Sequence, residues 1–276
     1  MLWALFGCTY AEKPTFDVLV VSIDGTPRAL LDEEWATLEV LPAIAAEGSH
    51  QNLIVQGVTD TVASHARMLT GFGPEITGVT SARHFGTIPE GLSIPERLRA
   101  RFGPDLRILF EVNKPYMLGI EDDTQAFWHL AQACDVAANH AMPVDVTPHM
   151  LDALAGVGEA PFFAFFHWAA VDEAGHQFDE GSAEQRAALH EVDANLGQVR
   201  DALVAMGRWE RTLVYVTTDH GFPPGGHSHY EGAEAVWLIT TDPEVGLGNY
   251  LDQLPWTILD RYGVTVTEPA PPLGGL

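Results

Sequence analysis

The chain has 276 residues, of which 46% are hydrophobic, and this composition is typical of a folded protein with a substantial core. Its 38 acidic and 14 basic residues give a formal net charge of −24. A charge of this sign and size excludes binding to nucleic acid or to an anionic membrane through a general basic surface. We interpret the excess charge as a solvated acidic surface. A small anionic substrate is still compatible with it if metal ions dominate the field at the site.

The N-terminus leaves two interpretations open. Leu5-Phe6-Gly7-Cys8 resembles the end of a bacterial lipoprotein signal, but the apolar stretch before Cys8 is too short to span a membrane. Either residues 1–13 are the remnant of such a signal and Cys8 is lipidated, or the likeness is chance. The first case implies a periplasmic or extracellular lipoprotein that contacts the membrane through Cys8, and the second a cytoplasmic protein. Only one other cysteine, Cys134, occurs, so the chain has no disulfide framework.

Continuous apolar runs predict strands that are covered by helices on both faces of a sheet. They lie at residues 16–23, 107–112, 161–168 and 212–217, with a further strand expected at 236–240. The clearest helix is expected at 183–206, where Leu189, Val192, Leu196, Val199 and Leu203 recur at helical spacing. Strands that alternate with helices predict an α/β fold, a three-layer α/β/α sandwich with a mostly parallel central sheet. No linker divides residues 14–276, so we expect a single domain there.

Four groups of polar side chains follow strand ends, where open α/β sheets gather their ligand-binding groups. They are Asp24; Thr61 with Ser64 and His65; Asp172 with His176; and Asp219-His220 with His227 and His229. Asp and His supply the oxygen and nitrogen ligands that zinc and similar ions take. Asp172 and His176 are four residues apart, a spacing that lets both reach one ion. Three Asp/His groups are enough for two ions, an arrangement that suits phosphoryl transfer.

Each group also has an ordinary structural explanation. An Asp after a strand commonly caps a turn, and Thr61 is compatible with the cap of a helix. The two roles can coexist at Thr61, because a helix N-terminus also favours an anion. Ser64 is as compatible with capping as with a contact to a phosphoryl oxygen. Lys114 is either a solvated side chain or a ligand of a nonbridging oxygen.

The ordered set of motifs resembles the alkaline phosphatase superfamily, in particular its type I phosphodiesterase/nucleotide pyrophosphatase and sulfatase-like branches. The motifs are V-S-I-D-G at 21–25, T-x-x-S-H-x-x-x-x-T-G at 61–71, D-E-A-G-H at 172–176, T-D-H-G at 218–221 and G-G-H at 225–227. Residues 98–114 are similar to the sulfatase stretch that leads to a substrate-binding Lys, and 254–263 to the closing helix of that fold.

The resemblance implies an alkaline phosphatase-like fold with two divalent metal ions, zinc in the first instance and manganese as the alternative. It assigns one ion to Asp24, Thr61, Asp219 and His220, and the other to Asp172, His176 and His227, with His229 as the alternative to His227. It makes Thr61 the catalytic nucleophile and assigns substrate contacts to Ser64, His65 and Lys114.

Departures from the sulfatase pattern favour phosphate over sulfate. Thr61 stands where sulfatases carry a Cys or Ser that is converted to an aldehyde, which Thr cannot form. His65 replaces the sulfatase Arg, Ala63 the Pro, and Gly25 the second Asp of an Asp pair. Thr is instead the nucleophile of the phosphodiesterase branch.

These observations predict a metal-dependent hydrolase of small-molecule phosphate esters, a phosphodiesterase or phosphatase, that acts through a phospho-threonine intermediate. Three alternatives stay open: a phosphomutase of the same superfamily, a sulfatase-like hydrolase, and a non-catalytic binding protein that metal ions stabilise. The leaving group and the oligomeric state do not follow from the sequence.

Overall fold

The computed structural model describes residues 10–114, 118–226, 232–265 and 273. Strands from this part of the chain form a seven-stranded sheet in the order β2-β7-β6-β1-β5-β3-β4. They are β1 (Asp17–Ile23), β2 (Ser49–Ile54), β3 (Arg107–Val112), β4 (Val136–Asn139), β5 (Phe162–Trp168), β6 (Thr212–Thr217) and β7 (Ala235–Thr240). All pairs are parallel except the two that β7 makes with β2 and β6. The prediction of a mostly parallel sheet is confirmed.

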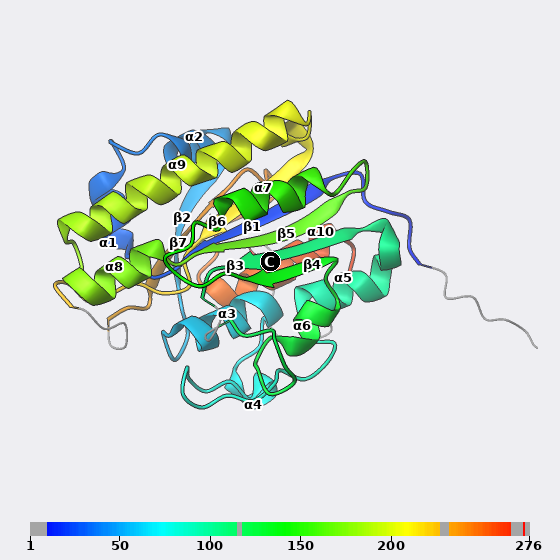
Figure 1. Cartoon of the computed structure of the whole chain (residues 1–276), viewed down its shortest axis with the longest axis horizontal. Helices are drawn as coiled ribbons and strands as arrows, with labels where there is room; N and C mark the ends of the chain where they lie inside the picture. Colours follow the sequence, from blue (N-terminus) through cyan, green and yellow to red (C-terminus); the bar gives the residue numbers. More distant parts are fainter. Residues whose placement is uncertain (1–9, 115–117, 227–231, 266–272, 274–276) are drawn as a thin grey trace, which may run out of the picture.

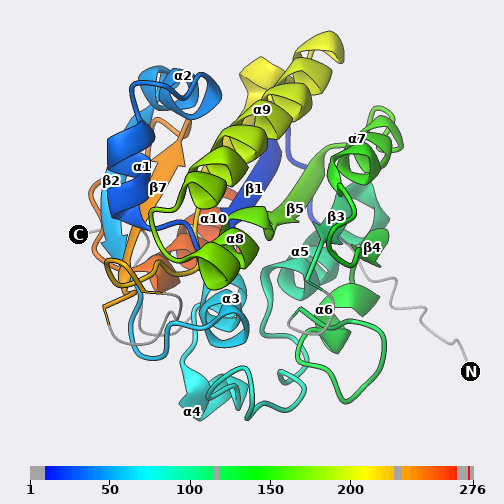
Figure 2. The same cartoon turned by 60° about the vertical axis from the view of Figure 1, so that its left-hand side comes forward.

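Helices cover both faces of this sheet (Figures 1 and 2). One layer holds α1 (Arg28–Glu34), α2 (Val40–Glu47), α7 (Thr147–Ala155), α8 (Ala170–Phe178) and α9 (Ala183–Ala205). The other holds α3 (Thr61–Thr70), α5 (Ile94–Phe102), α6 (Trp128–Gln132) and α10 (Leu254–Arg261), with α4 (Pro74–Thr77) at its margin. Short 3₁₀ turns are η1 (Gly103–Asp105), η2 (Trp209–Arg211) and η3 (Leu251–Gln253). The predicted α/β/α sandwich is therefore confirmed.

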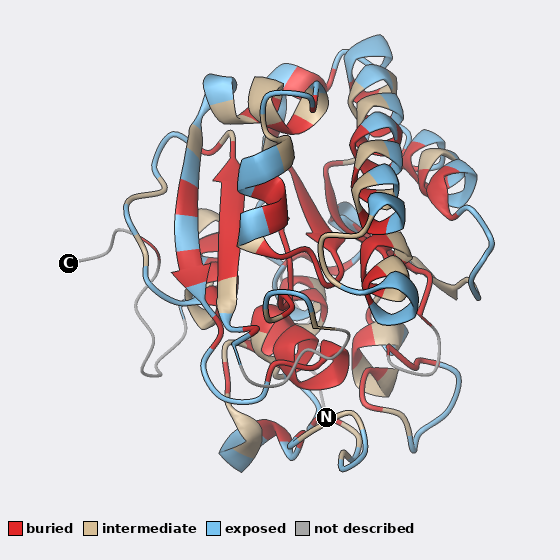
Figure 3. Ribbon diagram, turned by 90° about the vertical axis from the view of Figure 1, so that its left-hand side faces the viewer, coloured by how far each residue is buried: buried red, intermediate tan, exposed pale blue. Residues whose placement is uncertain are grey.

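The apolar runs are continuous because the side chains of each central strand pack into two hydrophobic clusters, one on each face of the sheet. In β1, Val18 and Val20 pack into the cluster that includes α3, α5 and α10, whereas Leu19 and Val21 pack into the cluster that includes α7 and α9. Alternate side chains of a strand point to opposite faces, so a strand that is covered twice must be apolar at every position. Figure 3 shows the result, with the central strands buried along their length.

The predicted strands agree with the observed ones to within one residue, and the predicted long helix matches α9. The sequence analysis did not predict β2 and β4. β2 (S-H-Q-N-L-I) is a polar strand at the sheet edge, with several of its side chains exposed, and β4 has only four residues. In the described ranges no helix is both long and apolar enough to cross a membrane. The stretch Leu5-Phe6-Gly7-Cys8, which resembles the end of a lipoprotein signal, lies outside the described residues.

The helix that begins at Thr61 is capped by the residue before it. Asp60 is the N-cap of α3, and its side chain accepts a hydrogen bond of 2.9 Å from the backbone N–H of Ala63. The other carboxylate oxygen of Asp60 accepts a hydrogen bond from the N–H of Ala82. The alternative that Thr61 is the cap is therefore wrong, and its hydroxyl is not used to satisfy the helix end.

Candidate metal centre and active site

Parallel strands bring four of the predicted ligands to one edge of the sheet. β1 lies between β5 and β6, all three run in the same direction, and their carboxyl ends meet. Asp24 follows β1, Asp219 and His220 follow β6, and Asp172 lies in the first turn of α8 after β5. All four residues are fully buried. The site therefore forms where open α/β sheets usually bind their ligands.

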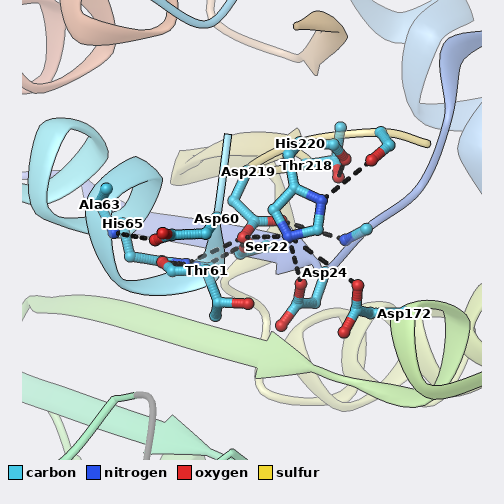
Figure 4. Close-up of polar contacts among 12 residues, drawn as sticks. Ser22, Asp24, Asp60, Thr61, Ala63, His65, Asp172, Thr218, Asp219 and His220 are labelled. Carbon is cyan, nitrogen blue, oxygen red and sulfur yellow. Dashed lines mark hydrogen bonds and ion pairs between the residues drawn. The ribbon is translucent and has the colours of Figure 1, made fainter. Parts of the chain in front are cut away.

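The imidazole of His220 lies at the centre of three carboxylates (Figure 4). Its Nδ1 is 3.1 Å from the carbonyl oxygen of Gly221, which can only accept, so Nδ1 carries a proton. Its Nε2 is 3.4 Å from Asp24 Oδ1, 3.4 Å from Asp219 Oδ2 and 3.8 Å from Asp172 Oδ1. A ring nitrogen that faces three carboxylate oxygens is a favourable place for a metal cation.

The spacing and the hydrogen bonding of this cluster fit a divalent cation. Two ligands of a tetrahedral ion with bonds near 2.1 Å lie about 3.4 Å apart, which matches the distances around Nε2. One ligand atom each of Asp24, Asp172 and His220 lies within 4.8 Å of the others. Three buried oxygens, Asp24 Oδ1, Asp172 Oδ1 and Asp219 Oδ2, have no hydrogen-bond partner among the described residues. Because such oxygens are costly to bury, the donor set suits an ion.

Asp172 and His176, predicted as ligands of a second ion, lie one turn apart on α8. His176 Nε2 is 3.6 Å from Asp172 Oδ2, and its side chain is 38% exposed. His227 and its alternative His229 lie outside the described residues. The described part of the chain thus contains two of the three side chains predicted for that ion.

Lys114, predicted to contact substrate, inserts its ammonium group between the carboxylates. Nζ lies 3.2 Å from Asp24 Oδ2, forms a close ion pair with Asp172 Oδ2 and donates to Thr61 Oγ1 at 3.4 Å. The side chain is only 4% exposed. Burial alone would lower the pKa of Lys114, but Asp24 and Asp172 outweigh burial and raise it, so the group stays charged.

The same charges act on Asp24. Burial and the neighbouring Asp219 favour the protonated carboxyl, but Lys114 and a hydrogen bond from His167 prevail and lower the pKa of Asp24 to about 2. Asp219 follows the same rule: burial acts against its charge, and His220 and His65 more than compensate, so its pKa is also lowered. Both carboxylates are ionised at neutral pH, as metal ligands must be.

We expect Lys114→Met to destabilise the protein strongly when divalent ions are removed. The variant leaves two buried carboxylates without their counter-charge, a change that typically costs about 3–5 kcal/mol. Zinc should recover much of this loss, because an ion replaces the missing charge. The measurement is urea unfolding in chelator and in zinc, with the exposed Lys13→Met as the matched control. An equal loss of stability with and without zinc contradicts this account of Lys114.

His65, which was predicted to contact substrate, lies against Thr61 and Asp219. Its ring is fully buried, with Nε2 2.9 Å from Ser22 Oγ and Nδ1 2.7 Å from the carbonyl oxygen of Thr61. Nδ1 also lies 3.3 Å from Asp219 Oδ2. Burial disfavours the charged ring, but Asp219 raises the pKa of His65 overall. Both ring nitrogens face protein atoms. His65 is therefore placed to hold Thr61 and Asp219 in position rather than to contact substrate directly.

Ser64 lies one turn after Asp60 on α3. Its hydroxyl is fully buried and has no hydrogen-bond partner in the described ranges, so it does not cap the helix. A hydroxyl can both donate and accept, and this one is therefore available to a ligand oxygen.

One further residue of the site escaped the sequence analysis. His167 lies in β5 with Nε2 2.9 Å from Asp24 Oδ2, and its only sequence signal is a lone His in the apolar run F-F-A-F-F-H-W. Gly25 has a positive φ of 60°, and a Cβ there would lie 2.4 Å from Asp172 Oδ1. Any side chain at Gly25 would push Asp172 away, so this chain has no room for a second Asp after Asp24 without a shift of Asp172.

Known proteins are similar to this chain in sequence or in structure. Bis(5'-adenosyl)-triphosphatase ENPP4 of Bos taurus is 35% identical over 108 residues, which is 39% of this chain and 21% of that protein. The match thus spans about a fifth of the bovine relative. The phosphonate monoester hydrolase of Agrobacterium radiobacter superposes with a TM-score of 0.63 at 17% identity, over 91% of this chain and 74% of that one. Murine ectonucleotide pyrophosphatase/phosphodiesterase 5 gives 0.58 at 19% identity, over 74% and 57%.

The two structural similarities establish a shared fold of the alkaline phosphatase type. The sequence of residues 18–88 and 121–236, more than half of the chain, matches the family described as type I phosphodiesterase / nucleotide pyrophosphatase. The matched segments carry Asp24, Thr61, Asp172, Asp219 and His220, which the fold brings together at this site. The chain therefore belongs to the type I phosphodiesterase / nucleotide pyrophosphatase family.

Proposed function

We propose that the protein is a metal-dependent hydrolase of small-molecule phosphate esters, with Thr61 as the nucleophile at a centre of two divalent ions. The observation that carries the proposal is the position of Thr61. It is the first residue of α3, and its hydroxyl accepts a hydrogen bond from the ammonium group of Lys114, which also contacts Asp24 and Asp172. The side chain is 1% exposed, as expected for a nucleophile kept away from bulk water.

We divide the ligands between the two ions as the family resemblance implies. One would be held by Asp24, Thr61, Asp219 and His220, and the other by Asp172, His176 and His227, with His229 as the alternative. Zinc suits this mixture of carboxylate and imidazole ligands, and manganese accepts the same set. Such ions neutralise charge on phosphoryl oxygens and make a hydroxyl a better nucleophile.

The reaction proceeds in two displacements. The Oγ of Thr61 gives up its proton to water and attacks phosphorus, a new P–O bond forms, and the bond from phosphorus to the leaving group breaks, after which the leaving alkoxide takes a proton from water. A water molecule then attacks the phosphorylated Thr61 at phosphorus and loses a proton to solvent, the P–Oγ bond breaks, and Oγ takes up a proton. The buried hydroxyl of Ser64 and the N-terminus of α3 stabilise the negative phosphoryl oxygens.

Relatives support phosphorus as the centre of reaction. The bovine relative is named a triphosphatase and the Agrobacterium structure a phosphonate monoester hydrolase, and both names describe cleavage at phosphorus. We propose the same class of reaction for this chain, on a phosphate monoester or diester.

We expect phosphate esters to be hydrolysed well above sulfate esters, because Thr61 cannot form the aldehyde on which sulfatases depend. The measurement compares p-nitrophenyl phosphate, bis(p-nitrophenyl) phosphate, a p-nitrophenyl phosphonate and p-nitrophenyl sulfate, all with the same leaving group, in zinc and in manganese. Thr61→Ala, purified in parallel, controls for contaminating phosphatases. Turnover of the sulfate without turnover of any phosphorus ester refutes the proposal, and binding of the ions without any turnover favours a non-catalytic protein.

A further inference from the structure

A histidine stands in the most apolar strand of the sheet. β5 reads F-F-A-F-F-H-W, each of its residues is buried, and His167 is fully enclosed. An imidazole in such surroundings destabilises the fold unless its polar atoms find partners. Packing alone would be satisfied by another Phe or Leu, so the ring calls for a specific explanation.

The register of the strands points this ring at one carboxylate. His167 lies opposite Ser22 in the parallel pair of β1 and β5, and Asp24 comes two residues after Ser22, on the same face of the sheet. A backbone hydrogen bond of 2.9 Å from Asp24 N to Trp168 O continues the pairing past the end of β1. His167 Nε2 then reaches Asp24 Oδ2 at 2.9 Å.

The ring of His167 is fixed in this orientation. The ring of His65 packs edge-on against it, with centroids 5.1 Å apart and planes at 73°. Ser22 and the carbonyl of Thr61 in turn hold His65. His167 Nδ1 has no hydrogen-bond partner among the described residues, so Nε2 is its engaged nitrogen and carries the proton donated to the carboxylate.

The two oxygens of Asp24 consequently have different roles. Oδ2 is held by His167 and Lys114, whereas Oδ1 lies 3.4 Å from Nε2 of His220 and has no hydrogen bond in the described part of the chain. A carboxylate held at one oxygen cannot rotate freely, and its other oxygen keeps one direction.

We infer that His167 is a positioning residue that orients Asp24, so that Oδ1 is presented to a divalent ion together with His220. The inference rests on the metal centre of the proposed function, but not on the ester that the centre cleaves. Hydrogen-bond partners of metal ligands commonly change metal affinity by about 10- to 100-fold when they are removed.

The test measures zinc affinity of the full chain by competition with a chromophoric chelator, after removal of endogenous metal and a check of folding by circular dichroism. His167→Leu removes the donor and fills most of the space, and we expect its zinc affinity to fall about 10- to 100-fold. His167→Gln places an N–H close to the position of Nε2, and we expect it to recover most of the loss. Phe163→Leu, at a fully buried position on the same face of β5, is the control that perturbs packing alone, with a lower Tm and unchanged affinity.

The outcomes separate positioning from packing. Wild-type affinity in His167→Leu overturns the inference, as does an equal loss in His167→Gln and His167→Leu, or an equal loss in Phe163→Leu. If the wild-type chain binds no zinc or manganese, the inference and the proposed metal centre fail together. If the affinities follow the expected order but no phosphorus ester is hydrolysed, the proposed function fails and the role of His167 stands.

Discussion

Replacing Thr61 by Ala should lower turnover of a phosphate ester by roughly four to six orders of magnitude, the scale of losing a catalytic nucleophile. The variant removes the attacking oxygen and one of the side chains proposed to hold an ion. Thr61→Ser keeps the hydroxyl and loses only a methyl group, so we expect it to retain much of the activity. Initial rates with the best ester of the screen, at saturating zinc, measure both variants.

Stability separates this role from a structural one. Because Asp60 caps α3, Thr61→Ala removes no capping hydrogen bond, and its Tm should stay near that of the wild type. Thr70→Ala is the matched control, a buried Thr in the same helix whose hydroxyl donates to the carbonyl of Ala66. It should lose about 1 kcal/mol of stability and keep its turnover. A fully active Thr61→Ala protein would mean that the proposed mechanism is wrong, even if the ions are bound.

Removal of divalent ions should abolish hydrolysis, and zinc or manganese should restore it. Binding to the folded state should also stabilise the protein, by about 2.7 kcal/mol when free zinc reaches 100 times its Kd. The measurements are elemental analysis of gently purified protein, rates before and after dialysis against chelator, and Tm as a function of zinc concentration.

A pair of Asp→Asn variants locates the ions. Asp219→Asn removes a carboxylate that lies 3.4 Å from His220 Nε2, so we expect it to lose bound metal and activity. Asp193→Asn changes a buried carboxylate of α9 that accepts hydrogen bonds from the backbone N–H groups of residues 39–41 at the start of α2, so it should lower stability but keep the metal. Undiminished hydrolysis in chelator, or equal metal content in the two variants, argues against the proposed centre.

Local patterns were sufficient to predict the framework of the protein. A strand covered on both faces must be apolar at each position, so the runs that became β1, β3, β5, β6 and β7 are visible without any structure. Parallel strands gather their carboxyl ends at one edge, so polar residues just after those runs were expected to meet. Asp24, Asp172, Asp219 and His220 do meet, because their positions follow from strand order and direction.

Contacts between residues far apart in the chain decided the rest. Lys114 is 58 residues from Asp172, and nothing in its neighbourhood shows that its ammonium group lies among carboxylates rather than in water. His65 and His167 depend on the register of β1 with β5 and on the packing of α3 over them. The polar edge strand β2 is stabilised by its antiparallel pairing with β7. Neither the existence of β2 nor the direction of β7 can therefore be recognised from the local sequence. Hydrophobic periodicity reports only whether a residue is buried, and which charged groups share a buried site is set by the tertiary fold.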